Sequence, residues 1–76
     1  MEKWCFTFGS DHRDSEGRTL KDCFVTVEGS FNAARNMIHT ARGDKWAFQY
    51  SAEGFESQVY EYDLVERTLE EVTIND

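Results

Sequence analysis

Only one segment of this sequence has helical periodicity, and segments with the two-residue alternation of β-strands flank it on both sides. Within residues 31–42 the apolar side chains recur at three-and-four spacing, which places them on one face of a helix. Ser30 precedes the segment as a good N-cap, and Gly43 follows it where a left-handed C-terminal glycine belongs. One short amphipathic helix buries a single stripe, so its packing partner is predicted to be a small β-sheet.

Four other segments alternate in the manner of β-strands, namely residues 3–8, 20–28, 45–50 and 58–66. Two of them are predicted to carry heavy aromatic faces, made of Trp4, Phe6 and Phe8 in the first and of Trp46, Phe48 and Tyr50 in the third. Most of these rings are predicted to form the core against the apolar side of the helix, because large rings dominate the buried area of small domains.

The order of the segments predicts an α+β fold, ββαββ, in which an antiparallel sheet of about four strands carries the helix on one face. A chain of 76 residues allows one domain, residues 1–76. Residues 68–74 are predicted to extend the fourth strand or to add a short fifth one, and the tail, about residues 69–76, is predicted to fray. A single helix covers only one face of a sheet, so the other face is predicted to be uncovered and available for docking.

Groups that could carry catalysis or hold a metal are few. The polar loop 9–19 contains Asp11, His12 and Asp14, the one place where histidine and carboxylates cluster. These residues could belong to a metal site or an acid–base pair, but no second cluster of histidine and carboxylates stands elsewhere in the sequence to complete it. The preferred interpretation is a solvated loop in which Asp side chains cap turns. The sequence has no phosphate-binding glycine motif and no credible nucleophile with its base. We therefore expect no catalytic residues, no metal and no cofactor.

The two cysteines, Cys5 and Cys23, lie in apolar strand segments of a chain that shows no export signal. Thiols in this setting are typically reduced and pack as small hydrophobic groups. A disulfide between neighbouring strands is the less favoured alternative. Zinc binding is not expected, because the sequence has no closely spaced pairs of cysteine or histidine.

The charge of the chain is concentrated in its last third. Residues 1–52 hold seven acids and seven bases, whereas residues 53–76 hold eight acids and one base, so this third carries the whole net charge of −7. Two interpretations remain open: a solvated acidic edge that keeps a small protein soluble, or a surface that meets a basic partner. Direct binding of DNA or RNA is not expected there, because affinity for phosphates comes from Lys and Arg.

Tyr60 and Tyr62 alternate with acids in the predicted fourth strand. Tyrosine is favoured at interfaces. To a basic cleft, carboxylates beside tyrosine rings resemble the phosphates and bases of a nucleic acid. The competing interpretation is an ordinary edge strand, in which the like charges prevent aggregation with other sheets. The residues predicted to contact a partner are Glu53, Glu56, Tyr60, Glu61, Tyr62, Asp63, Glu66, Glu70 and Glu71.

A second candidate site lies on the predicted helix, where Arg35, His39 and Arg42 recur at i, i+4 and i+7 on its polar side. Its functional interpretation is a basic stripe for phosphate, which would make the protein an oligomeric module that binds or sequesters a small phosphorylated ligand. Three residues form a thin footprint, and one of them is a mostly neutral histidine. A solvated helix face is the competing interpretation.

Three stretches between residues 4 and 66 carry a recognisable pattern. They are Phe6-Thr7-Phe8-Gly9, Ala33-Ala34-Arg35 with Met37, and Lys45-Trp46-Ala47-Phe48-Gln49-Tyr50, of which the last is the most specific. The pattern resembles a group of small uncharacterised proteins encoded by bacteriophages and prophages. The resemblance implies a phage accessory protein that works in the cytoplasm of a bacterial host. Small acidic phage proteins of this kind include many inhibitors of host defences, anti-CRISPR proteins among them.

These features together predict a non-enzymatic, phage-encoded inhibitor. Its expected partner is a bacterial host protein or ribonucleoprotein complex with a basic groove, which the acidic third would contact as a nucleic-acid mimic. We expect no membrane association, because no apolar run is long enough to span a bilayer and the N-terminus does not resemble a signal peptide. A homodimer remains open, because a sheet with one helix leaves apolar surface and an open edge.

Overall fold

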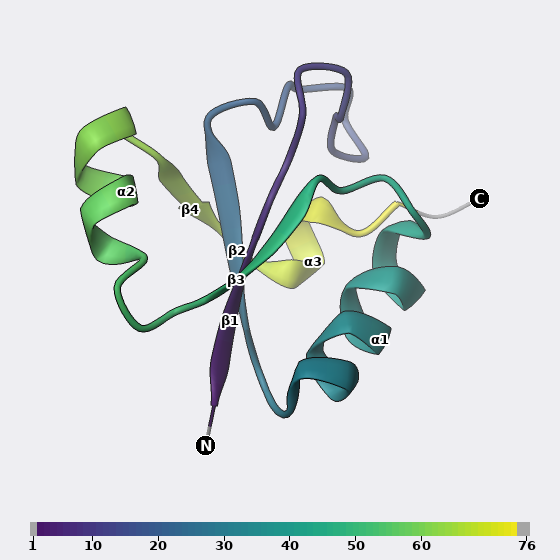
Figure 1. The fold of residues 1–76 in the computed structure, drawn as a ribbon. Coiled ribbons are helices and arrows are strands. Elements are labelled where there is room, and N and C mark those ends of the chain that lie inside the picture. Colours follow the sequence, from purple (N-terminus) through teal and green to yellow (C-terminus); the bar gives the residue numbers. More distant parts are fainter. Residues whose placement is uncertain (1, 75–76) are drawn as a thin grey trace.

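A four-stranded sheet forms the centre of the fold in a computed structural model, which describes residues 2–74 (Figure 1). The elements in chain order are β1 (Lys3–Thr7), β2 (Cys23–Glu28), α1 (Phe31–Arg42), β3 (Phe48–Ser51), α2 (Glu56–Tyr62), β4 (Val65–Arg67) and α3 (Leu69–Val72). Helices α1 and α3 lie on one face of the sheet, and α2 lies on the other (Figure 1). The predicted α+β class with one main helix is therefore confirmed.

The strands are arranged in the order β3-β1-β2-β4. Strand β1 pairs antiparallel with β2 and β3, as the prediction of an antiparallel sheet requires. Strand β4 pairs parallel with β2, with Cys23 opposite Val65, so the sheet is mixed and the prediction is wrong at this pair. The cause is the helical connection from β3 to β4, which carries the chain across the sheet and returns it in the same direction.

Two crossover connections explain why the helices occupy opposite faces. The chain runs from β2 through α1 to β3 in one lateral direction, and from β3 through α2 to β4 in the other. When two crossovers run in opposite lateral directions, they keep the same hand only if their helices lie on opposite faces. The strong preference for right-handed crossovers thus favours α2 on the face that α1 leaves open.

Helix α1 begins and ends where the sequence predicts. The Ser30 side chain accepts a hydrogen bond from the backbone N–H of Ala33 at 3.1 Å, and the N–H of Gly43 donates to the carbonyl of His39. Gly43 has a φ of 67° and a ψ of −127°, so it has the positive φ that favours glycine but not the left-handed helical conformation that the sequence predicts. The buried stripe includes Ile38, whose side chain is fully buried against the sheet, whereas the predicted stripe residue Met37 remains 45% exposed.

The main core lies between the sheet and the two helices of this face. The rings predicted for it meet edge-on: Trp4 contacts Phe31 with centroids 5.1 Å apart, and Phe6 contacts Trp46 at 5.3 Å. Edge-to-face pairs at this spacing stabilise a core beyond the area they bury. The core residues are Phe6, Phe8, Leu20, Val25, Val27, Ala34, Ile38 and Val72.

Residues 58–66 do not form the predicted fourth strand, because α2 occupies Glu56–Tyr62 and only three residues after it are extended. Phe55 and Val59 are four residues apart, so one helical turn brings both side chains onto the sheet. The tyrosines whose alternation suggested a strand point to solvent, Tyr60 at 90% and Tyr62 at 62% exposure. The helix therefore covers part of the face that the sequence predicted to be open.

The predicted frayed tail, 69–76, begins instead with the short helix α3. Thr68 and Glu71 form a capping box, in which each side chain accepts a hydrogen bond from the other residue's backbone N–H. Val72 is fully buried in the main core, which ties the segment to the fold. The prediction of a frayed tail is therefore wrong for residues 69–72. Residues 75–76 lie outside the described part of the chain, so the prediction is untested for them.

The second and third strands start later than the alternation predicted, at Cys23 and Phe48. Because Trp46 precedes β3, it turns to the α1 side and packs on the main core, whereas Phe48 and Tyr50 lie on the α2 side of the sheet. The prediction that these three rings share one face is therefore wrong. Phe48, near the end of an edge strand, remains 62% exposed.

Candidate functional site

The nine residues predicted to contact a partner fall on two different faces of the sheet. Glu70 and Glu71 belong to α3, which packs beside α1. The other seven belong to α2 and the segments on either side of it. We call these seven the α2–β4 surface, defined as Glu53, Glu56, Tyr60, Glu61, Tyr62, Asp63 and Glu66. The structure therefore brings Glu56, Tyr60 and Glu66 to one hollow, leaves the other four on the segments beside them, and separates two acids of the predicted set from the rest.

The five carboxylates of the α2–β4 surface are exposed, and none of them forms an ion pair with another side chain in residues 2–74. Residues 53–66 contain no Lys or Arg that could pair with them locally. Glu71 contrasts with them, because it lies 3.4 Å from Arg67 and caps α3, and both contacts lower its pKa. The only base of the acidic third is thus held away from the α2–β4 surface.

An aromatic cluster fixes α2 against the sheet. Phe55 is 3% exposed, and its ring lies 5.3 Å from that of Phe24 on β2 and 5.6 Å from that of Tyr50 on β3. Val59 packs against the same cluster one turn later. Glu56, Tyr60, Glu61 and Tyr62 of α2 remain exposed around these anchors.

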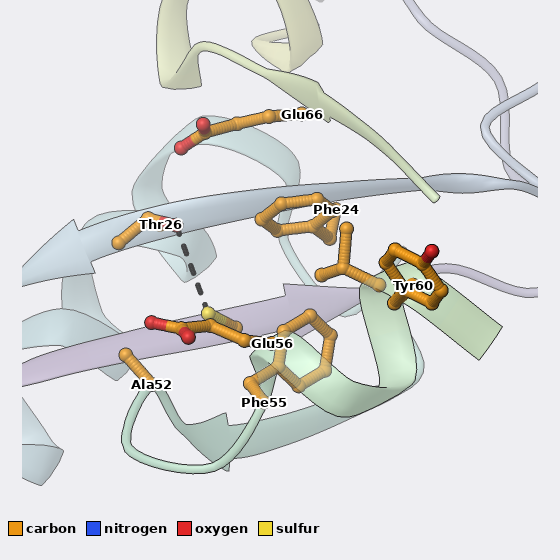
Figure 2. Close-up of a pocket in the computed structure, with 9 residues that line it drawn as sticks. Phe24, Thr26, Ala52, Phe55, Glu56, Tyr60 and Glu66 are labelled. Atoms are coloured by element: carbon orange, nitrogen blue, oxygen red, sulfur yellow. Dashed lines mark hydrogen bonds between the residues drawn. The ribbon is translucent and has the colours of Figure 1, made fainter. Parts of the chain in front are cut away.

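A hollow of about 340 Å³ lies between α2 and the sheet, at the edge of the aromatic cluster (Figure 2). Phe24, Phe55 and Val59 form its apolar wall, and Cys5 lies at its base. Glu56 approaches the opening from α2 and Glu66 from β4 on the opposite side (Figure 2). Both carboxylates point toward the end of the hollow where Thr26 lies, and Tyr60 lies beside the other end (Figure 2).

The Cys5 thiol is not suited to nucleophilic chemistry. Its side chain is buried, and burial raises the pKa of the thiol above its ordinary value. Its one polar contact is with the Thr26 hydroxyl, 3.7 Å from the sulfur. The thiol is therefore protonated near neutral pH and packs as an apolar group. Cys5 and Cys23 are both free thiols, the first buried and the second half-buried, as the sequence predicts.

The alternative site on α1 does not assemble as a stripe. Arg42 is 3% exposed, because its guanidinium donates hydrogen bonds to the carbonyls of Val72 and Lys45, both at 2.7 Å. The prediction that Arg42 lies on the polar side of the helix is therefore wrong, and its donors are committed to the fold. Arg35 and His39 do lie together at the surface, where Arg35 stacks on the Trp46 ring at 5.2 Å.

Asp14 in the polar loop caps a turn, as predicted, but it is buried rather than solvated. Its carboxylate accepts hydrogen bonds from the backbone N–H groups of Glu16 and Arg18, and from the Arg67 guanidinium at 3.0 Å. These donors hold the pKa of Asp14 well below its ordinary value. In residues 2–74 no three His, Cys, Asp or Glu side chains are grouped so that they could hold a metal ion.

Comparison of the chain with protein-family models, with curated proteins and with solved structures gave no match. The resemblance to small phage-encoded proteins therefore stays a prediction. None of the helices within residues 2–74 has the length and apolar character needed to cross a bilayer.

Proposed function

We propose that this protein is a non-enzymatic inhibitor that binds a basic surface of a partner through its α2–β4 surface. The observation that carries the proposal is a set of five exposed carboxylates without an ion pair in the described chain, all on α2 and the segments beside it. Two of them, Glu56 and Glu66, line an apolar hollow. Solvated acids spread over a whole surface would serve solubility alone. Acids gathered on one face, beside an aromatic-walled hollow and two exposed tyrosines, favour recognition.

The chemistry of this surface favours a basic protein or ribonucleoprotein over a nucleic acid. Carboxylates repel phosphates, whereas they attract and orient a surface rich in Lys and Arg and increase the rate of encounter. Tyr60 and Tyr62 offer apolar rings with polar tips beside these charges. To a basic groove, exposed carboxylates beside exposed rings resemble the phosphates and bases of the nucleic acid that the groove normally holds.

The partner that we propose is a basic groove of a bacterial defence complex or of another nucleic-acid-handling complex in the host cytoplasm. This part of the proposal depends on the resemblance to small phage and prophage proteins. An anti-CRISPR-like inhibitor is one form that it takes. Blocking such a groove needs only occupancy, so a protein of 76 residues without catalytic groups is sufficient for the task.

The test is capture of partners from a lysate of the bacterial host by the tagged protein, with identification by mass spectrometry. A true partner is retained at low salt and released at high salt, because screening weakens attraction between exposed charges. The triple variant Glu53→Lys, Glu61→Lys, Asp63→Lys is expected to lose that same partner. None of these three residues lines the hollow.

A matched control changes the net charge equally on other parts of the molecule. Asp11, Asp44 and Glu70 are exposed and lie outside the α2–β4 surface, so their triple replacement by Lys is expected to retain the partner. Equal capture by the two triple variants would contradict the proposal, as would capture that high salt does not weaken.

A further inference from the structure

We propose that the hollow between α2 and the sheet receives one arginine side chain from the basic partner. This inference rests on the function proposed above and gives the α2–β4 surface a specific anchor. It follows from three features of the hollow: its size, the separation of its apolar and acidic ends, and the absence of any base among its lining residues.

The size of the hollow suits one side chain. Pockets for small molecules usually enclose about 300–1,000 Å³ and bury most of their ligand. At about 340 Å³ and open to solvent, this hollow lies near the lower limit of that range. A single long side chain reaching in from a partner fits within it, and the partner's backbone remains outside.

The two ends of the hollow match the two parts of an arginine. Phe24, Phe55 and Val59 offer an apolar wall for the aliphatic stem. Glu56 and Glu66 lie on opposite sides of the opening and direct their carboxylates to the same end (Figure 2). A guanidinium there has two acceptors at hand, and a planar cation also stacks on aromatic faces more readily than an ammonium does.

Nothing within the described chain already fills this role. The lining residues include no Lys, Arg or His, and neither Glu56 nor Glu66 forms an ion pair in residues 2–74. An opening lined by two carboxylates and by no base attracts a cation. The charge complement is therefore expected to come from another molecule.

The other hollows of the molecule lack this combination. The one between α1 and α3 is lined by residues such as Met37, Thr40 and Leu69 and contains no charged group. The one at the α1 surface includes Arg35, His39 and Asp44, so its charges are of both signs. Only the hollow beside α2 joins an aromatic wall to charges of a single sign among those described.

The experiment is an NMR titration of the full chain, labelled with ¹⁵N, with Nα-acetyl-arginine amide. The citrulline analogue is the control probe, because it has nearly the same shape without the charge. Arginine is expected to shift the amide signals of residues lining the hollow in a saturable manner. Citrulline is expected to bind about tenfold more weakly or worse, because hydrogen bonds to charged groups are the stronger ones. The lysine analogue is expected to fall between the two.

Two variants separate the hollow from the general charge of the surface. Ala52→Leu adds an apolar group at the lining of the hollow and keeps every charge, and it is expected to remove the arginine response. The pair Glu56→Gln and Glu66→Gln is expected to reduce the response to that of citrulline. Glu70→Gln, on the opposite face, is expected to leave it unchanged, and the dispersion of each spectrum reports whether the variant is folded.

An equal response to arginine and citrulline, a response located elsewhere on the molecule, or no response would overturn the inference. A response to lysine equal to that of arginine would also overturn it, because arginine would not be the preferred occupant. Binding of the captured partner to the variants shows whether only the arginine site is wrong or the proposed function is wrong as well. If Ala52→Leu binds that partner as the wild type does while Glu53→Lys, Glu61→Lys, Asp63→Lys does not, the surface is correct and the hollow is not its anchor.

Discussion

Two charged side chains, Asp14 and Arg42, are buried in the described chain, and both hold distant segments together. Asp14 joins its own loop to Arg67 on β4, and Arg42 joins the end of α1 to the carbonyl of Val72 on α3. Buried charges persist when their hydrogen-bonding capacity is satisfied, which is the case for both. These residues therefore act in the fold and not in recognition.

Replacing Asp14 with Asn is expected to lower the free energy of unfolding at pH 7, because the amide cannot accept the same charge-assisted hydrogen bonds. The folded state holds the pKa of Asp14 below its ordinary value of 3.8, so the ionised carboxylate stabilises the fold above that pH. This stabilisation is lost as the pH falls toward the lowered pKa. The difference between wild type and variant is therefore expected to shrink below about pH 4. Urea unfolding between pH 7 and pH 2.5 measures it, and a difference that grew on acidification would contradict the assignment.

Arg42→Lys is expected to lower the free energy of unfolding by about 1–3 kcal/mol, although it conserves the charge. One ammonium cannot reproduce the fork that reaches the carbonyls of both Lys45 and Val72, nor the stacking of the guanidinium over Phe8 at 5.1 Å. Arg13→Lys is the control, because Arg13 is exposed and its guanidinium makes one exposed hydrogen bond, to the carbonyl of Gly17. The expected change for it is within about 0.5 kcal/mol. Equal denaturation midpoints for the two variants would show that Arg42 does not hold α1 to α3.

Helix α2 matters most for the candidate site, and the sequence pattern predicted a strand in its place. Gln58 to Glu66 alternate well enough to suggest a strand, but the alternating tyrosines remain in solvent. The signal that indicates a helix is weaker than this alternation. It consists of two apolar residues, Phe55 and Val59, at a spacing of four, which a helix places on one face. Tertiary packing on Phe24 then decides between the two patterns.

The same reasoning explains which other elements were predictable. Helix α1 was predictable because its cap, its stripe and its terminal glycine all agree. Arg42 lies four residues after Ile38, so the period itself places it on the buried face, a signal that its charge obscured. Thr68 and Glu71 have the spacing of a capping box, which marks α3 in the sequence. The parallel pairing of β4 was not predictable without α2, because it depends on the crossover.

Asp63 ends α2 in a left-handed conformation, with a φ of 52°, and it is the one non-glycine residue of the described chain with positive φ. Asp63→Gly is expected to raise the free energy of unfolding by about 0.5–1 kcal/mol, because glycine adopts this conformation without a steric cost. Removing a negative charge from the C-terminal end of the helix acts in the same direction. Thermal and urea unfolding measure the change.

A glycine placed inside the same helix is the control for Asp63→Gly. Glu61→Gly is expected to lower the free energy of unfolding by about 0.5–1 kcal/mol, since glycine loses more conformational freedom there. A rise in the free energy of unfolding for Asp63→Gly together with a fall for Glu61→Gly would support α2 as a helix that ends at Asp63. Loss of stability in both would contradict the cap.

At the scale of the whole molecule, the two faces of the sheet differ in how they are covered. The α1 face contains the main core, closed by α1 and α3. The α2 face has a smaller cluster around Cys5, Phe24 and Phe55, and the hollow remains open beside it. The acids gather over this second face, where they contribute little to packing. Charge changes there are therefore expected to alter binding more than stability.

The most direct test of the account is the affinity of the purified partner for the two charge-reversed triple variants, measured by calorimetry at low salt. Replacement of Glu53, Glu61 and Asp63 by Lys is expected to weaken binding by about 100-fold or more, since like charges then face each other across the interface. The control at Asp11, Asp44 and Glu70 is expected to stay within about threefold of wild type, with both variants folded. Equal losses in the two variants would mean that net charge alone governs binding and that the α2–β4 surface is not the contact.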